Sequence, residues 1–419
     1  MQRKTRIWIG LGAAVMVGGT SVDRTALAWD LAGPDSPASG AAFGGPERLF
    51  AAQAEGGEGG PGEGGGQVLG TITEFRLSST VPGAFDYDAA AQVTAYGELV
   101  HGTYVAAQEA AKALREAIAA LLDDPSPEAF EAARQAWRAA RDAYLRTEAF
   151  QFYAGPVDAP GGPLPRLNSW PVDADRVAGI IGDPSVPLDF RGLARMNQAG
   201  GAGEVTTGLH VVELLLWGED GDREHSDFVA GVGDNDRRGA YLSAAAQLLV
   251  NDLGLLVAAW APGRNNYRAA VEAMDQRNAL GRAFNGMTVL VGYEIPLRRI
   301  GAGLFPANEN FQPSPFSDTS TADNRFAFEG ARDVYYETGL DALIAGADAG
   351  LAAEIDAAFA RAETALLALD APYARFLAPA AGSRERATAE QAVRALTDLG
   401  RELRRAGNRL GVLVVVPGL

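Results

Sequence analysis

An unbroken apolar stretch in the middle of the chain places the strongest constraint on how it can fold. Residues 209–217 (Leu-His-Val-Val-Glu-Leu-Leu-Leu-Trp) contain only two polar side chains, those of His210 and Glu213. A helix of this composition has no solvent face, so we expect it to be buried on all sides. Any fold of the chain must therefore surround this segment and supply partners for two buried polar groups.

The flanking residues define the ends of this helix, and the spacing defines its polar pair. Thr206 or Thr207 suits the N-cap position, and Gly218 stands just past the C-terminal end. His210 and Glu213 are three residues apart, so their side chains leave the same face. Two interpretations are open: the pair forms a hydrogen bond within the core, or it supplies two ligands of a metal ion that other residues complete.

Helical periodicity also dominates the rest of the chain. Ser126 and Pro127 suit the start of a helix whose apolar face includes Trp137 and Tyr144, with arginines, among them Arg141, on a predicted solvated face. A later helix over residues 284–303 is expected to be interrupted at Pro296. Strand-like alternation is nearly absent. The predicted fold class is all-α, with two antiparallel helical-bundle domains and the His-x-x-Glu helix near their interface.

The beginning of the chain has the pattern of an export signal. Arg3, Lys4 and Arg6 precede an apolar run over residues 7–19, and small residues follow. This pattern predicts a cleavable signal peptide over residues 1–28, and a periplasmic or secreted protein without an integral membrane segment after cleavage.

Composition divides the remaining chain into three predicted parts. Residues 29–84 are rich in Gly, Pro and Glu, which is typical of a flexible segment. Residues 85–230 are assigned to an N-terminal helical bundle, and residues 231–419 to a C-terminal one.

Cysteine content and charge exclude several function classes. The chain has no cysteine, which excludes disulfides, thiolate catalysis, thiolate metal sites and a lipidated N-terminal cysteine. The net charge of −17 disfavours nucleic acid as a partner and suits a cation. A metal ion would have to bind oxygen and nitrogen ligands.

Two further acidic residues are candidates for a site. Glu148 stands among aromatic residues at the end of the helix that begins near Ser126. A carboxylate in such surroundings is either paired or functional. Asp173 follows a Pro-rich loop over residues 154–172, and we expect it to cap the next helix. Long loops of this kind within compact domains are often functional.

Four motifs together resemble one known family, the imelysin family. Members of this family are catalogued as M75-like peptidases. They are iron-regulated periplasmic or surface proteins related to the iron-transport protein EfeO. The motifs are Gly-x-His-x-x-Glu at 208–213, the Arg- and Trp-containing helix at 134–141 that leads to Thr147-Glu148, Asn-Ser-Trp-Pro-Val-Asp at 168–173, and Phe-Ser-Asp-Thr at 316–319.

The resemblance implies a metal site between two helical bundles and a role in iron uptake or iron-regulated physiology. It implies His210 and Glu213 as metal ligands, Glu148 and Asp173 as acids facing the same cleft, and Glu294 as an acid of the second half. The implied cofactor is a divalent or trivalent metal ion. Iron is the ion implied first, and zinc is the alternative. Envelope iron-uptake components are the implied protein partners.

The resemblance is incomplete in one place. The family's second-half loop commonly carries an acidic run with His and often Cys before Phe-Ser-Asp, whereas residues 308–315 here contain neither His nor Cys.

Three functions remain open from the sequence. A metal-binding protein requires only carboxylates and one imidazole in a cleft. A metallopeptidase also needs a metal with an open position and a separate base, yet the chain has no His-Glu-x-x-His motif and only three histidines. The third alternative is a helical interaction protein whose His-Glu pair is structural.

Overall fold

The computed structural model describes residues 14–17, 20–23, 87–304, 312–369 and 372–417. Strands β1 (Ala14–Val17) and β2 (Thr20–Asp23) pair antiparallel, with Val15 opposite Val22. The other residues of the predicted signal peptide and of the segment up to residue 84 lie outside the described residues, so both assignments stay predictions.

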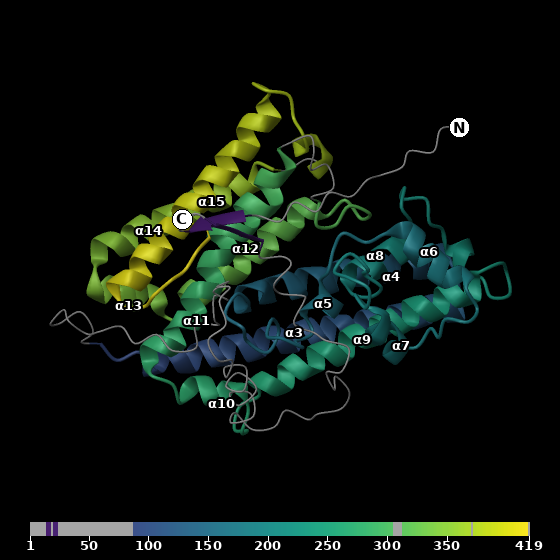
Figure 1. Cartoon of the computed structure of the whole chain (residues 1–419), viewed down its shortest axis with the longest axis horizontal. Helices are drawn as coiled ribbons and strands as arrows, with labels where there is room; N and C mark the ends of the chain where they lie inside the picture. Colours follow the sequence, from purple (N-terminus) through teal and green to yellow (C-terminus); the bar gives the residue numbers. More distant parts are fainter. Residues whose placement is uncertain (1–13, 18–19, 24–86, 305–311, 370–371, 418–419) are drawn as a thin grey trace.

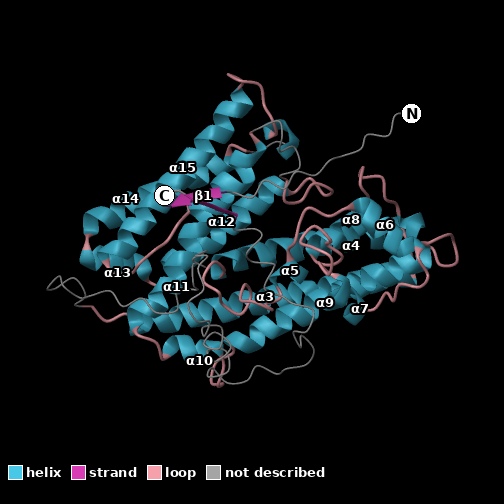
Figure 2. Cartoon of the chain, viewed as in Figure 1, coloured by secondary structure: helices cyan, strands magenta, loops and turns pink. Residues whose placement is uncertain are grey.

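From residue 87 on, every described element is helical, which confirms the all-α prediction for this part of the chain (Figure 2). The helices, in chain order, are α3 (Ala90–Asp123), α4 (Pro127–Leu145), η1 (Arg146–Phe150), α5 (Leu164–Leu167), α6 (Ala174–Gly182), α7 (Phe190–Met196), α8 (Leu209–Trp217), η2 (His225–Phe228), α9 (Asn235–Trp260), α10 (Tyr267–Glu272), α11 (Gln276–Val289), η3 (Leu290–Gly301), α12 (Ser320–Glu337), α13 (Leu340–Ala347), α14 (Ala349–Leu367), η5 (Tyr373–Phe376) and α15 (Arg384–Arg409).

The helices pack in two groups that touch each other (Figure 1). In the first group α3 lies along α4 and α9, and α8 rests on α4 and α9. In the second group α15 packs against η3, α14 and α11. Helices α11 and α12 contact η1, which joins the two groups. The predicted boundary between the two domains, at residue 230, lies just before α9, and α9 packs on α3. The boundary itself remains a prediction.

Helix α9 is long and apolar enough to cross a membrane by length and composition. Most of its apolar window is buried against other helices, however. Its apolar character is therefore explained by its place in the core of the first group.

Helix α4 begins where the sequence predicts. The Ser126 side chain accepts a hydrogen bond from the Ala129 N–H, and Pro127 occupies the first turn. Trp137 and Tyr144 are buried along one face. The Trp137 indole N–H donates to the carbonyl of Leu209 at 2.8 Å, so α4 holds the beginning of α8 in place.

The N-cap of α8 differs from the prediction. Gly208, not Thr206 or Thr207, occupies that position, with φ of 105° and no side-chain cap. A Cβ atom on Gly208 would lie 2.9 Å from the Leu167 carbonyl oxygen, so glycine serves both the backbone conformation and this close approach. Gly218 ends the helix with φ of 80°, as predicted.

Pro296 does not interrupt its helix, contrary to the prediction. It lies inside η3, a π-helix of 12 residues in which the wider winding accommodates the missing proline N–H. Hydrogen bonds in a π-helix join residues five apart, so such residues share a face. Glu294 and Arg299 accordingly approach to 4.0 Å between Oε1 and Nε.

Two glycines allow the helix groups to approach each other closely. A Cβ atom on Gly330 of α12 would lie 2.3 Å from the Arg146 carbonyl oxygen, and one on Gly286 of α11 would lie 1.9 Å from the Ala149 carbonyl oxygen. Both oxygens are backbone atoms of η1, which cannot move aside as a side chain can. The contact between the groups therefore depends on the absence of these two side chains.

We expect Gly330→Ala to lower the free energy of unfolding by about 1 to 3 kcal/mol, because the methyl group overlaps η1. The matched control is Gly346→Ala in α13, where a Cβ atom meets nothing within 4 Å. This control should leave stability unchanged or slightly raised. Urea denaturation measures both variants, and equal midpoints for Gly330→Ala and the unmodified chain would contradict the packing described.

Candidate functional site

Helix α8 presents its polar pair inside the protein. Every residue of α8 is buried, and His210 and Glu213 have exposures of 1% and 0%. The Nδ1 atom of His210 lies 3.0 Å from Oε2 of Glu213. The i, i+3 spacing thus produces a direct contact between the imidazole and the carboxyl group.

The second oxygen of Glu213 holds the segment that precedes α12. Glu213 Oε1 accepts hydrogen bonds from the backbone N–H of Phe316 at 3.0 Å, the backbone N–H of Ser317 at 2.9 Å and the Ser317 hydroxyl at 2.8 Å. A single carboxyl oxygen therefore links α8 to a segment about one hundred residues later. This is the Phe-Ser-Asp-Thr motif of the sequence.

Asn168 connects the imidazole to the neighbouring charges. Its Oδ1 lies 3.2 Å from His210 Nε2 and also accepts a hydrogen bond from Arg141 Nη1. Its Nδ2 donates to Glu148 Oε1 at 2.9 Å. Because Oδ1 can only accept a hydrogen bond, Nε2 of His210 carries the ring proton and donates a hydrogen bond to it. In a neutral ring, Nδ1 then has no proton and accepts a hydrogen bond from the Glu213 carboxyl group.

Two buried ion pairs flank this hydrogen-bonded group. Arg299 Nη2 donates to Glu148 Oε2 at 2.8 Å. Arg141 donates to Asp323 Oδ2 from Nη2 at 2.8 Å and from Nε at 3.1 Å. All four side chains are buried, and their charges balance. Ser314 adds a hydroxyl donor to Asp323 Oδ2 at 2.7 Å. We call these side chains together with His210, Glu213, Asn168 and Ser317 the buried polar cluster.

The environment holds the His-Glu pair in its uncharged form. Burial raises the pKa of Glu213 to about 8, against hydrogen bonds from Ser317 that act in the opposite direction. Burial, followed by the charges of Arg141 and Arg299, lowers the pKa of His210 well below its ordinary value. Near neutral pH a single proton therefore lies between His210 Nδ1 and Glu213 Oε2, and it is bound to the carboxyl group.

The structure brings three of the four predicted ligands into one cluster. His210 and Glu213 touch directly, and Glu148 joins them through Asn168. Asp173 is exposed, and its carboxylate caps α6 by accepting the Arg176 backbone N–H at 3.1 Å. The predicted capping role of Asp173 is thus observed, and within the described part of the chain no hydrogen bond or ion pair joins its carboxylate to the other three side chains.

Sequence reasoning missed several members of the cluster. Arg141 was predicted to be solvated, but it is buried and paired with Asp323. A signal was present, since Arg141 is four residues after Trp137 and three before Tyr144, on the apolar face of α4. Asn168 stood in a recognised motif without an assigned role. Asp323 carried no local signal, because its partner is 182 residues away.

The donor set does not fit a metal ion in this arrangement. Both nitrogens of His210, both oxygens of Glu213 and both oxygens of Glu148 already bind protein groups. Two guanidinium groups lie within the cluster and repel a cation. Among the described residues, no group of three or more His, Asp or Glu side chains is placed to hold a metal ion.

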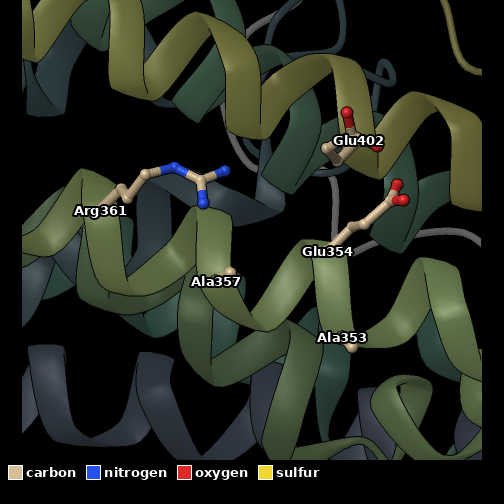
Figure 3. A pocket seen from close by; sticks show the side chains of 5 residues that line it. All are labelled: Ala353, Glu354, Ala357, Arg361 and Glu402. Carbon is tan, nitrogen blue, oxygen red and sulfur yellow. The ribbon is translucent and has the colours of Figure 1, made fainter.

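A surface hollow between α14 and α15 offers no alternative metal centre. It is lined by Ala353, Glu354, Ala357, Arg361 and Glu402 (Figure 3). Its two carboxylates are both bound to Arg405. It contains no imidazole, so the buried polar cluster remains the candidate site.

The raised pKa of Glu213 predicts how stability depends on pH. The folded protein keeps this proton at pH values where the unfolded chain has lost it, so the stabilising contribution is lost as pH rises towards 8. His210, whose pKa is lowered in the folded protein, adds a smaller slope of opposite sign, which fades as pH rises above 6.5 and the unfolded imidazole loses its remaining proton. Between pH 6.5 and 8 we expect Glu213 to remove about 1 to 2 kcal/mol of stability.

The Glu213→Gln variant isolates this effect, because an amide does not titrate. The difference in unfolding free energy between the unmodified chain and Glu213→Gln should change over this pH range, as measured by urea denaturation at several pH values. Parallel pH profiles for the two proteins would show that Glu213 is not protonated in the folded state.

Comparison with known proteins places the chain in a family. The imelysin family (peptidase M75) matches residues 100–403. Iron-regulated protein A of Synechococcus elongatus is 26% identical over 322 residues, covering 72% of this chain and 81% of that protein.

Two solved structures have a similar fold. A candidate iron-regulated protein A precursor from Parabacteroides distasonis has a TM-score of 0.64 at 18% identity, covering 78% of this chain and 97% of that chain. An imelysin-like protein from Psychrobacter arcticum has a TM-score of 0.60 at 18% identity, covering 79% and 99%. With the family match over residues 100–403, these similarities confirm the resemblance seen in the sequence: the chain belongs to the imelysin family.

Proposed function

We propose that this chain serves iron-related physiology outside the cytoplasm as a non-catalytic helical protein. Membership of the imelysin family and similarity to a protein named iron-regulated protein A support the link to iron. The basic and apolar pattern of residues 1–28 supports export to the periplasm or beyond. Envelope iron-uptake components are the partners that this role implies.

The observation that carries the proposal is that the polar side-chain atoms of His210 and Glu213 all have hydrogen-bond partners within the protein. Each nitrogen of His210 and each oxygen of Glu213 has a protein partner, and these partners come from both helix groups. In this role the two groups act as two domains, and the buried polar cluster locks them in one relative position. The protein then presents a rigid surface to its partner.

The geometry does not favour a metallopeptidase. Such an enzyme needs an open metal position and a base beside the attacking water. Glu213 is the carboxyl group that contacts the imidazole, at 3.0 Å, and its Oε1 alone accepts three hydrogen bonds. A carboxyl group bound in this way serves poorly as a base.

Cation binding by His210, Glu213, Glu148 and Asp173 is the alternative, and the acidity of the chain favours it, with a net charge of −17. Such binding requires the ligands to exchange their hydrogen bonds for metal bonds. It also requires Asp173 to leave the N-terminus of α6. Each exchange has a free-energy cost that the metal must offset.

Calorimetric titration with Fe(II) and Zn(II) separates the two roles. We expect His210→Ala to lower the free energy of unfolding by about 1 to 3 kcal/mol, because Glu213 and Asn168 lose a buried partner. The same substitution should leave the metal-binding isotherms unchanged. The matched control is His225→Ala in η2, a histidine outside the cluster. Saturable binding that is lost in His210→Ala and kept in His225→Ala would instead establish a metal site.

A further inference from the structure

Within the core where the two helix groups meet, several polar side-chain atoms have no hydrogen-bond partner in the described part of the chain. These atoms are Nε and Nη1 of Arg299, Oδ1 of Asp323, both polar atoms of Asn324, the Tyr144 hydroxyl and Nε2 of Gln151. All five residues are at most 6% exposed. A buried polar group without a partner is costly, so several of them in one region require a physical explanation.

The unpartnered atoms belong to elements that pack against one another. Tyr144 lies in α4, Arg299 in η3, and Asp323 and Asn324 near the start of α12. Helix α12 packs against both α4 and η3. Burial raises the pKa of the Tyr144 hydroxyl, and the guanidinium charge of Arg299 acts on it in the opposite direction, so these two side chains are also close. The unpartnered atoms therefore share one region of the core.

Some of these side chains approach a polar neighbour without bonding to it. Burial raises the pKa of the Tyr373 hydroxyl, and the neighbouring Asn324 amide acts to lower it. Burial likewise raises the pKa of Tyr144, on which the Gln151 amide acts to lower it. Among the described residues, however, no direct hydrogen bond satisfies Asn324, the Tyr144 hydroxyl or Gln151 Nε2. Buried polar groups that approach each other in this way are commonly bridged by ordered water.

The charges in this region argue against an ion as the missing partner. Arg299 is paired with Glu148 at 2.8 Å, and Arg141 is paired with Asp323 at 2.8 Å. An added anion would face two carboxylates, and an added cation would face two guanidinium groups. The side chain of Glu294, 4.0 Å from Arg299 Nε, is 23% exposed, so its charge is screened by solvent. A neutral partner avoids the cost of an unbalanced buried charge.

The unpartnered atoms also require a partner that both donates and accepts hydrogen bonds. Nε and Nη1 of Arg299 and Nδ2 of Asn324 can only donate, whereas Oδ1 of Asp323 and Oδ1 of Asn324 can only accept. The Tyr144 hydroxyl can do either. Water is neutral, has both functions and is small enough for a closed protein core.

We propose that Tyr144, Arg299, Asp323 and Asn324 form a binding site for ordered water inside the contact between the two helix groups. Water at this site accepts hydrogen bonds from the guanidinium and amide N–H groups and donates to the carboxylate and amide oxygens. The two buried ion pairs then belong to one hydrogen-bonded network, because Arg299 and Asp323 bind the same group of water molecules. Each water molecule that bonds to more than one element adds a link between α4, η3 and α12.

A matched pair of substitutions tests the proposal by the sign of its effect on stability. Tyr144→Phe removes a buried hydroxyl at the proposed site. Tyr335→Phe removes another buried hydroxyl without a partner, which lies beside the ring of Phe359 instead. If Tyr144 binds water, Tyr144→Phe leaves that water with one bond fewer, and the melting temperature should fall by a few degrees. Tyr335→Phe should leave the melting temperature unchanged or raise it, because it removes a hydroxyl that binds nothing.

Crystallography of the full chain, at a resolution that shows ordered solvent, locates the water directly. We expect solvent density at hydrogen-bond distance from Arg299 Nη1 and from the side-chain amide of Asn324. The same map of Tyr144→Phe should lack the solvent density nearest to ring 144, with the surrounding side chains unmoved.

Three results would overturn the proposal. The first is a map in which these atoms bind other protein groups or no solvent at all. The second is density for an ion or a larger molecule, which would show that the site takes a different ligand. The third is a melting temperature of Tyr144→Phe that equals or exceeds that of the unmodified chain, as expected for Tyr335→Phe. Unchanged helical circular dichroism at low temperature verifies that both variants fold.

Discussion

Four buried charges control how the two helix groups meet. Arg141 pairs with Asp323, and Arg299 pairs with Glu148, all out of contact with water. A buried charge without its partner costs several kcal/mol, so neither pair tolerates separation. Each pair joins the first half of the chain to the second. The positions of α4, η1, η3 and α12 are therefore coupled.

The two ion pairs orient the uncharged side chains of the buried polar cluster. Asn168 contacts Arg141, Glu148 and His210, so its side-chain amide is oriented by the two ion pairs. That orientation places the ring proton of His210 on Nε2, and Nδ1 in turn accepts a hydrogen bond from the protonated carboxyl group of Glu213. The second oxygen of Glu213 is then free to bind the segment at Phe316 and Ser317. Through these contacts the His-x-x-Glu motif links α8 to the segment that leads into α12.

Local patterns in the sequence predicted the parts of the structure that depend on local physics. Ser126 and Pro127 begin α4, and Gly218 ends α8, because capping needs only neighbouring residues. The continuous apolar composition of α8 predicted its burial. The predicted interruption at Pro296 was wrong, because the chain continues through this residue as the π-helix η3, which packs against α15.

The pairing within the cluster could not be read from the sequence. Arg141 and Asp323 are 182 residues apart, and without the fold nothing identifies one as the partner of the other. Asp173 shows the opposite problem. Its family motif placed it with the ligands, but its local role as the cap of α6 accounts for its position. Long-range electrostatic pairs require the tertiary structure, whereas helix caps do not.

The central claim is that the buried polar cluster couples the two helix groups. A double-mutant cycle on Glu148 and Arg299, using Glu148→Gln and Arg299→Met, measures this most directly. The account predicts that the two substitutions are strongly non-additive, with a coupling free energy on the order of 1 to 3 kcal/mol in urea denaturation. Additive effects, with a coupling free energy near zero, would contradict it.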